Sequence, residues 1–154
     1  MRGRTSVLTF LLSLLLLSRV QSLLLHKVAL PLVGGPSWLK LHQAAVFEEP
    51  DGGKKRLLLL DYLPEEPESP ETALSLFTMN SVAGKVRVKE LRAFPYHGEI
   101  TETIEADCDV DALALRLEAD YDRRLRLASN NCRTFVSAVV AEALSSSGDG
   151  AAAQ

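Results

Sequence analysis

The chain has 154 residues, 47% of them hydrophobic, and a formal net charge of −3 at pH 7, which suits one domain with a buried core. This net charge, without a basic patch interleaved with aromatic residues, gives no electrostatic case for a nucleic-acid partner. Its two cysteines, Cys108 and Cys132, belong to neither a Cys-x-x-Cys pair nor a Cys/His cluster with zinc-ligand spacing. Since the sequence also has no Gly-rich phosphate loop and no dinucleotide fingerprint, we expect no metal and no cofactor.

Residues 1–22 have the features of a signal peptide. Arg2 and Arg4 give a positive start, an apolar run follows over residues 7–17, and residues 20–22 (VQS) have the form of a signal-peptidase site. Arg19 interrupts the run before it reaches the length of a transmembrane helix. We therefore expect a secreted or luminal protein of the secretory pathway. The alternatives are an uncleaved anchor, which would make this an endomembrane protein, or an organelle leader. Membrane contact is expected only through residues 7–25.

Residues 23–37 lead into the domain proper. Their apolar part, residues 23–33, is expected to lie against the domain as an N-terminal arm or as a strand, and the lone histidine, His26, is expected to be structural or exposed. The break at residues 34–37 (GGPS) places the domain at residues 38–144. Residues 145–154 are Ser, Gly and Ala for the most part, and we expect a disordered tail there.

Two apolar segments, residues 41–47 and 56–62, are expected to pair as a β-hairpin, the second of them buried on both faces. Between them Asp51-Gly52 is a type I′ turn signal, and a turn centred there would place His42 directly opposite Asp61, with Cβ atoms about 5 Å apart. A carboxylate in that position can fix the imidazole tautomer and stabilise the imidazolium. The alternative is an ordinary polar pair at a sheet margin, and a slip of one residue would separate the two side chains.

The middle of the chain alternates between helical and extended patterns. Residues 63–70, acidic and rich in proline, are expected to form a surface loop, and a short helix is expected over residues 72–79. Residues 84–91 and 99–106 alternate apolar and polar side chains, which is typical of half-exposed strands. A second helix is then expected to begin at Asp109 or Asp111, either of which can cap it.

Residues 129–136 (SNNCRTFV) are expected to form a loop that turns into a helix, with a cysteine in the first turn and the asparagines as N-caps. The apolar residues recur at the spacing of a helix with one buried face: Cys132, Phe135, Val136, Val139, Val140 and Ala143. The Cys132 sulfur would therefore point inward near the positive end of the helix dipole, which favours the nucleophilic thiolate. The alternative is a buried structural cysteine or half of a disulfide.

Three segments, residues 42–46, 59–64 and 131–136, resemble in this order the motifs of the circularly permuted papain-like group. That group includes lecithin retinol acyltransferase-like enzymes and PPPDE-type peptidases. Residues 42–46 (HQAAV) are similar to the group's His-x-Ala-hydrophobic strand, and residues 131–136 (NCRTFV) to its Asn-Cys-x-x-Phe-Val nucleophile motif. Residues 59–64 (LLDYLP) are similar to the segment where the acyltransferases carry their second histidine, so Asp61 would replace it. The chain also resembles plant and algal proteins of unassigned function.

The resemblance implies an α+β fold in which an antiparallel sheet packs against the nucleophile-bearing helix. It further implies a thiol hydrolase or acyltransferase that forms a thioester on Cys132 from an ester, amide or protein-conjugate substrate. His42 would pair with the thiolate and Asp61 would orient His42. Asn131 would serve as the cap or contribute to the oxyanion site, for which the backbone N–H of Cys132 is a further donor.

A competing interpretation is a domain of the same fold without catalytic activity. An oxidising compartment and two cysteines favour a Cys108–Cys132 disulfide, which would make this a non-catalytic secreted or luminal binding domain. The two interpretations differ only in the state of the Cys132 thiol.

Overall fold

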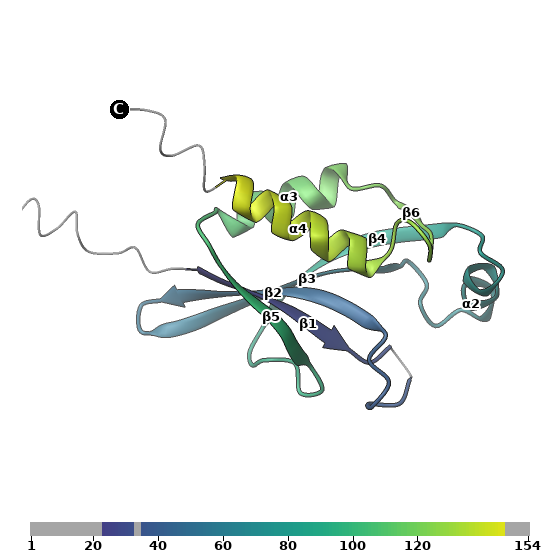
Figure 1. Cartoon of the computed structure of the whole chain (residues 1–154), viewed down its shortest axis with the longest axis horizontal. Helices are drawn as coiled ribbons and strands as arrows, with labels where there is room; N and C mark the ends of the chain where they lie inside the picture. Colours follow the sequence, from purple (N-terminus) through teal and green to yellow (C-terminus); the bar gives the residue numbers. More distant parts are fainter. Residues whose placement is uncertain (1–22, 33–34, 147–154) are drawn as a thin grey trace, which may run out of the picture.

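The computed structural model describes residues 23–32 and 35–146. Within these residues the chain forms one six-stranded antiparallel sheet and three helices, which confirms the expected α+β class with an antiparallel sheet (Figure 1). The sheet has the strand order β5-β1-β2-β3-β4-β6. In chain order the elements are β1 (Leu23–Leu30), β2 (His42–Asp51), β3 (Lys54–Pro64), α2 (Pro70–Phe77), β4 (Val82–Leu91), β5 (Glu99–Ala106), α3 (Val110–Asp120), β6 (Arg124–Leu125) and α4 (Cys132–Ser146).

Strand β1 lies inside the sheet, between β5 and β2. Of the two alternatives for this stretch, arm or strand, the structure has the strand, so the sheet includes residues ahead of position 38. At the other end of the domain, helix α4 runs to Ser146, two residues into the segment expected to be a disordered tail. The expected signal peptide at residues 1–22 and the remainder of the tail lie outside the described residues.

The β2–β3 hairpin turns one residue later than the sequence predicted. Its last strand pair is Asp51 and Lys54, so the turn residues are Gly52 and Gly53, with φ of 52° and 91°. A two-residue type I′ turn needs positive φ at both positions, and glycine adopts positive φ without steric cost. The residue directly opposite Asp61 is consequently Ala44 and not His42, so the predicted direct pairing was wrong.

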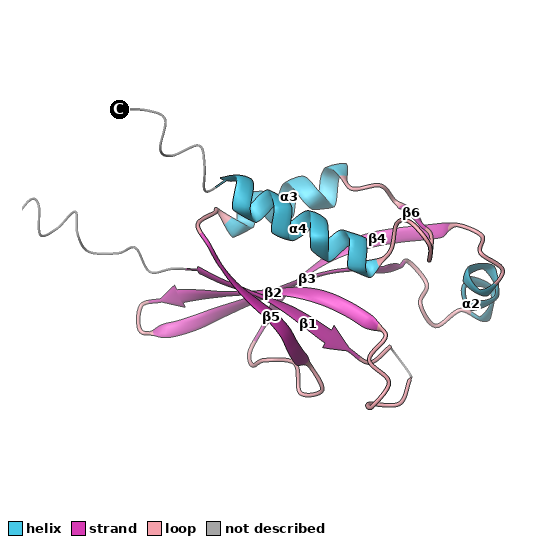
Figure 2. Cartoon of the chain, viewed as in Figure 1, coloured by secondary structure: helices cyan, strands magenta, loops and turns pink. Residues whose placement is uncertain are grey.

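Helices α3 and α4 cover one face of the sheet, as Figure 2 shows, and both faces of β2 and β3 are buried. The larger hydrophobic cluster lies between helices and sheet and includes Leu25, Ala45, Phe47, Leu58, Leu60, Tyr62, Leu113, Leu117, Phe135, Val136 and Val139. A smaller cluster uses the alternate positions of the same strands: Val28, Ala44, Val46, Leu57 and Leu59. Burial on both faces explains the unbroken apolar run that the sequence shows in β3.

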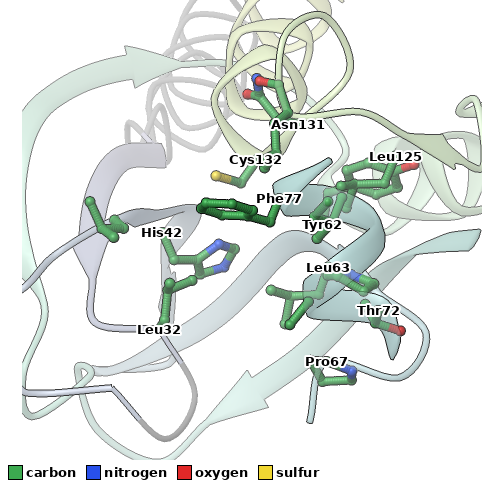
Figure 3. A pocket seen from close by; sticks show the side chains of 15 residues that line it. Leu32, His42, Tyr62, Leu63, Pro67, Thr72, Phe77, Leu125, Asn131 and Cys132 are labelled. Carbon is green, nitrogen blue, oxygen red and sulfur yellow. The ribbon is translucent and has the colours of Figure 1, made fainter. Parts of the chain in front are cut away.

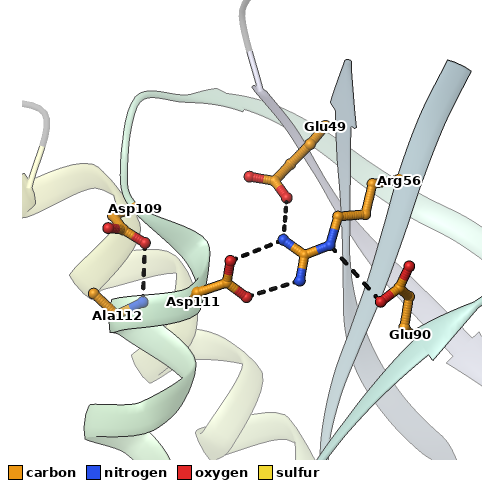
Figure 4. Close-up of polar contacts among 6 residues, drawn as sticks. All are labelled: Glu49, Arg56, Glu90, Asp109, Asp111 and Ala112. Carbon is orange, nitrogen blue, oxygen red and sulfur yellow. Dashed lines mark hydrogen bonds and ion pairs between the residues drawn. The ribbon is translucent and has the colours of Figure 1, made fainter. Parts of the chain in front are cut away.

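The first turn of α3 is attached to the hairpin by an arginine (Figure 4). Asp109 is the N-cap of α3 and accepts from the backbone N–H of Ala112 at 3.0 Å. Asp111, the other capping candidate, instead accepts both ends of the Arg56 guanidinium at 2.9 and 2.8 Å, and Arg56 also donates to Glu49 at 2.9 Å. This contact fixes the start of α3 over the far end of the hairpin.

Helix α2 is the least embedded of the helices. It begins at Pro70 after the N-cap Ser69, ends at Phe77, and has no buried residue. Figure 1 shows it standing apart from α3 and α4, beyond the ends of β3 and β4. None of the helices in the described part of the chain has the length and hydropathy needed to cross a bilayer.

Candidate active site

The structure brings His42, Asp61 and Cys132 together from three different elements. His42 is the first residue of β2, Asp61 lies within β3, and Cys132 is the first residue of α4. The ring Nε2 of His42 lies 3.1 Å from Oδ2 of Asp61, and the Cys132 thiol is within hydrogen-bonding reach of the same ring. Asp61 is fully buried and His42 is 5% exposed. Because Nε2 is occupied by the carboxylate, Nδ1 is the ring nitrogen left for the sulfur.

The pKa shifts of Cys132 and His42 favour a thiolate–imidazolium pair. Burial opposes the imidazolium, but the hydrogen bonds with Asp61 and Cys132 outweigh it and raise the pKa of His42 from 6.5 to about 9. Burial likewise opposes the thiolate, but His42 and the backbone of Gln43 outweigh it and hold the pKa of Cys132 below its ordinary value. Both shifts favour the same proton distribution, in which the sulfur is the nucleophile and the ring is the acid.

Asn131 caps helix α4. Its Oδ1 accepts from the backbone N–H groups of Arg133 and Thr134 at 2.9 and 3.2 Å, and its Nδ2 donates to the carbonyl of Leu127 at 2.7 Å. In return the Thr134 hydroxyl accepts from the backbone N–H of Asn131 at 2.8 Å, which is the reciprocal arrangement of a capping box. The first-turn N–H of Cys132 has no acceptor within the helix, and an N–H at this position can donate to an oxyanion formed at the sulfur.

The neighbouring Asn130 stabilises the loop before α4 and does not cap the helix. Asn130 Nδ2 donates to the carbonyls of Asp122 and Arg124 at 3.0 and 2.8 Å, while the Tyr62 hydroxyl donates to the same Asp122 carbonyl at 2.7 Å. These bonds tie the loop before α4 to the segment that leaves α3. The loop is thereby held where Cys132 meets the start of β2.

Arg87 is a member of the group that the sequence did not reveal. It lies in β4 directly opposite Asp61 and donates to both carboxylate oxygens, from Nε at 2.9 Å and from Nη2 at 2.6 Å. Burial opposes the ionised carboxylate, but the hydrogen bonds from His42 and Arg87 hold the pKa of Asp61 below its ordinary value. The available signal was the alternation of residues 84–91, which predicts a strand with Arg87 on one face but not the partner of that face.

A cavity of about 530 Å³ opens beside the sulfur, between α2 and the start of α4 (Figure 3). His42, Asn131 and Cys132 line one part of it, and most of the other lining side chains are apolar: Leu32, Leu41, Leu63, Leu76, Phe77, Leu125 and Leu127. Phe77 is 85% exposed although it borders the cavity. The site is therefore open to solvent along an apolar rim.

Both cysteines are free thiols, so the Cys108–Cys132 disulfide of the competing interpretation is not present in the structure. Cys132 lies at the His42 end of β2, whereas Cys108 lies near Glu49, towards the other end of that strand. His42 and Glu49 are seven positions apart, which corresponds to about 23 Å of strand, far beyond the reach of a disulfide. Burial and nearby carboxylates raise the pKa of Cys108, the opposite of the shift at Cys132.

His26 is separate from this group. It is buried within the sheet, where its Nδ1 lies 2.9 Å from the Thr103 hydroxyl, in keeping with a structural role. Within the described residues no group of three or more His, Cys, Asp or Glu side chains is placed to hold a metal ion. No protein-family model, curated protein or solved structure matches this chain.

Proposed function

We propose that the protein is a thiol-dependent hydrolase or acyltransferase that acts on an ester or amide bond through a thioester on Cys132. The observation that carries the proposal is the contact of Cys132 with His42. The Nε2 of the same ring is hydrogen-bonded to the buried carboxylate of Asp61. A cysteine kept only for packing would need neither an imidazole at the sulfur nor a carboxylate behind that imidazole.

The residues supply each proton transfer of such a reaction. The Cys132 thiolate attacks the carbonyl carbon, and the developing oxyanion accepts from the backbone N–H of Cys132. As the tetrahedral intermediate collapses, the bond to the leaving group breaks and the His42 imidazolium gives it a proton, which leaves a thioester and a neutral ring. Water then adds to the thioester while His42 takes its proton, and release of the acid restores the thiolate and the imidazolium. An acceptor hydroxyl or amine in place of water makes the enzyme an acyltransferase.

The apolar cavity supports a substrate that is apolar next to the scissile bond. The lining includes side chains such as Leu63, Leu76 and Phe77, which suit an acyl chain or an apolar side chain of a protein conjugate. We further propose a permuted papain-like arrangement, because the histidine and carboxylate strands precede the nucleophile helix in the chain, and a secreted or luminal location, because of the leader-like residues 1–22.

The pH dependence of Cys132 alkylation tests the proposal. Iodoacetamide labelling would be followed from about pH 5 to 9 in a Cys108→Ala protein that starts at Leu23, with and without His42→Ala. We expect labelling well below pH 8.5 and a slowing of at least about tenfold at pH 6 on removal of His42, since the imidazolium stabilises the thiolate. Cys108 in a Cys132→Ala protein is the matched control and should label slowly, as its pKa is raised. An ordinary thiol profile at Cys132 would overturn the proposal.

A chromogenic ester series then tests the substrate side. p-Nitrophenyl acetate, butyrate and octanoate would be compared in the wild type and in Phe77→Ser, which makes one cavity wall polar. We expect kcat/KM to rise with chain length in the wild type and to rise less in the variant. A flat dependence in both proteins would argue against an apolar acyl site.

A further inference from the structure

Arg87 completes the coordination of a carboxylate that has no contact with solvent. Asp61 is fully buried, and its Oδ2 takes both the Arg87 Nη2 at 2.6 Å and the His42 Nε2 at 3.1 Å, while Oδ1 takes the Arg87 Nε at 2.9 Å. The two hydrogen bonds from Arg87 are parallel and bidentate, the geometry that also fixes the carboxylate rotamer. Asp61 and Arg87 are direct partners in the β3–β4 pairing, so the register of these two strands places the guanidinium beside the carboxylate.

The charge of the group changes during the proposed reaction, and this change gives Arg87 its importance. In the resting enzyme Asp61 faces two cations, the His42 imidazolium and the Arg87 guanidinium. After His42 has protonated the leaving group, the ring is neutral and Arg87 is the one cation in hydrogen-bond contact with Asp61 among the described residues. A buried carboxylate without a counter-charge takes up a proton.

The protonation state of Asp61 decides which tautomer of His42 is present in the thioester stage. An ionised Asp61 accepts from Nε2–H, which leaves the lone pair on Nδ1, the nitrogen on the Cys132 side, free to take a proton from water. A protonated Asp61 would instead donate to Nε2, which forces the proton onto Nδ1 and blocks that step. Acylation, which starts from the imidazolium, does not depend on this choice.

We propose that Arg87 is a positioning residue that keeps Asp61 ionised while His42 is neutral and thereby holds the His42 tautomer needed to resolve the thioester. The role in the reaction rests on the function proposed above, but the effect on the tautomer does not. The side chain of Arg87 is 45% exposed, so its guanidinium keeps partial hydration while it serves the buried carboxylate. Arg87 acts through Asp61 and His42 and does not itself line the cavity.

The direct test reads the tautomer of His42 by long-range ¹H–¹⁵N NMR in protein whose Cys132 carries a carboxamidomethyl group, at a pH where His42 is neutral. The uncharged sulfur imitates the thioester stage, and His42→Gln assigns the signals. We expect the Nε2–H form in the wild type and in Arg87→Lys, and the Nδ1–H form in Arg87→Met. Arg87→Gln, which is also uncharged, replaces Arg87→Met if the latter does not fold. The same tautomer in the wild type and in the uncharged variant would overturn the proposal.

A matched control and a kinetic measurement separate this role from general stability. Lys89→Met removes a cation two residues along the same strand, opposite Leu59, and should leave the tautomer unchanged. With p-nitrophenyl acetate, Arg87→Met should keep the rate of the acylation burst within about threefold and slow deacylation at least about tenfold. Equal slowing of both steps would mark a structural role and overturn the assignment. An ordinary thiol profile in the alkylation experiment would end the proposed function, while the tautomer measurement would still decide the role of Arg87.

Discussion

His42 lies diagonally across the β2–β3 hairpin from Asp61, and its Nε2 is 3.1 Å from the carboxylate Oδ2. The direct partner of Asp61 on β2 is Ala44, whose methyl group leaves room for the imidazole to lean along the strand. Diagonal neighbours on a sheet are within reach of long or aromatic side chains. The ring is therefore held through its Nε2, which leaves Nδ1 for Cys132.

The acid role proposed for His42 predicts an upper pH limit for the cleavage of substrates whose leaving group must be protonated. Because the pKa of His42 is raised to about 9, the ring stays protonated through neutral pH and loses its proton as the pH rises through that value. We expect kcat/KM for an anilide substrate, whose leaving group must be protonated, to fall above about pH 9. The alkylation rate of Cys132, which needs no acid, should not fall there. A parallel decline in both rates would contradict this role.

Asp61 should stabilise the fold in a pH-dependent way. Its pKa is lowered in the folded state from 3.8, so its stabilisation is present above that value and is lost as the pH falls through the folded pKa. Asp61→Asn breaks a buried ion pair and should cost about 3 kcal/mol near pH 7 in urea unfolding, a cost that shrinks below about pH 4. Asp111→Asn is the matched control: Asp111 also receives a bidentate arginine but is largely exposed, so its loss should cost less than about 1 kcal/mol.

Two substitutions at Asn131 should separate the stability of α4 from the reactivity of its cysteine. Asn131→Ala removes the acceptor for the first-turn N–H groups and should lower the free energy of unfolding by about 1 kcal/mol. Asn131→Asp keeps the acceptor but loses the Nδ2 donor to the Leu127 carbonyl, so it should retain only part of that stability. Its carboxylate would, however, raise the pKa of Cys132, so alkylation at pH 6 should be slower than in the wild type. Equal stability of the alanine variant and the wild type would contradict the capping role.

Gly84 should tolerate no side chain. A Cβ at this position would overlap the phenol of Tyr62, which lines the cavity and donates to the Asp122 carbonyl. We expect Gly84→Ala to cost about 1–3 kcal/mol in the free energy of unfolding, because β4 or Tyr62 must shift. In a Tyr62→Leu background, where the phenol is gone, the same substitution should cost less than about 1 kcal/mol. An equal cost in both backgrounds would place the strain elsewhere.

The local patterns of the sequence predicted where helices and strands lie better than they predicted which elements pack or pair with one another. Residues 99–106 form a strand with the expected bounds, α3 is capped by one of the two expected aspartates, and Cys132 begins its helix. These features depend on spacing within a few residues, and periodicity or capping chemistry records them. The position of β1 inside the sheet and the pairing of β3 with β4 depend on contacts between distant segments, which no local pattern encodes.

In the candidate site, too, features set by local sequence could be predicted and features set by long-range contacts could not. The turn was predicted one residue too early, which moves each partner by two positions, and a shift of two keeps side chains on the same face. The meeting of His42 and Asp61 therefore survived the error, although their direct opposition did not. Arg87 could not be predicted, since it joins Asp61 through a strand pairing with a sequence separation of 26.

The strand order also sets the sequence in which the site can form during folding. The hairpin that carries His42 and Asp61 closes over a two-residue turn, so it can form from local contacts alone. The pairing of β1 with β5 must wait for β5, since His26 and its partner Thr103 are 77 positions apart, and α4 is the last of the described elements in the chain. Long-range pairings of this kind form slowly. On a nascent chain the Cys132 thiol would thus be the last part of the site to be added, after the His42 imidazole and the Asp61 carboxylate have been paired.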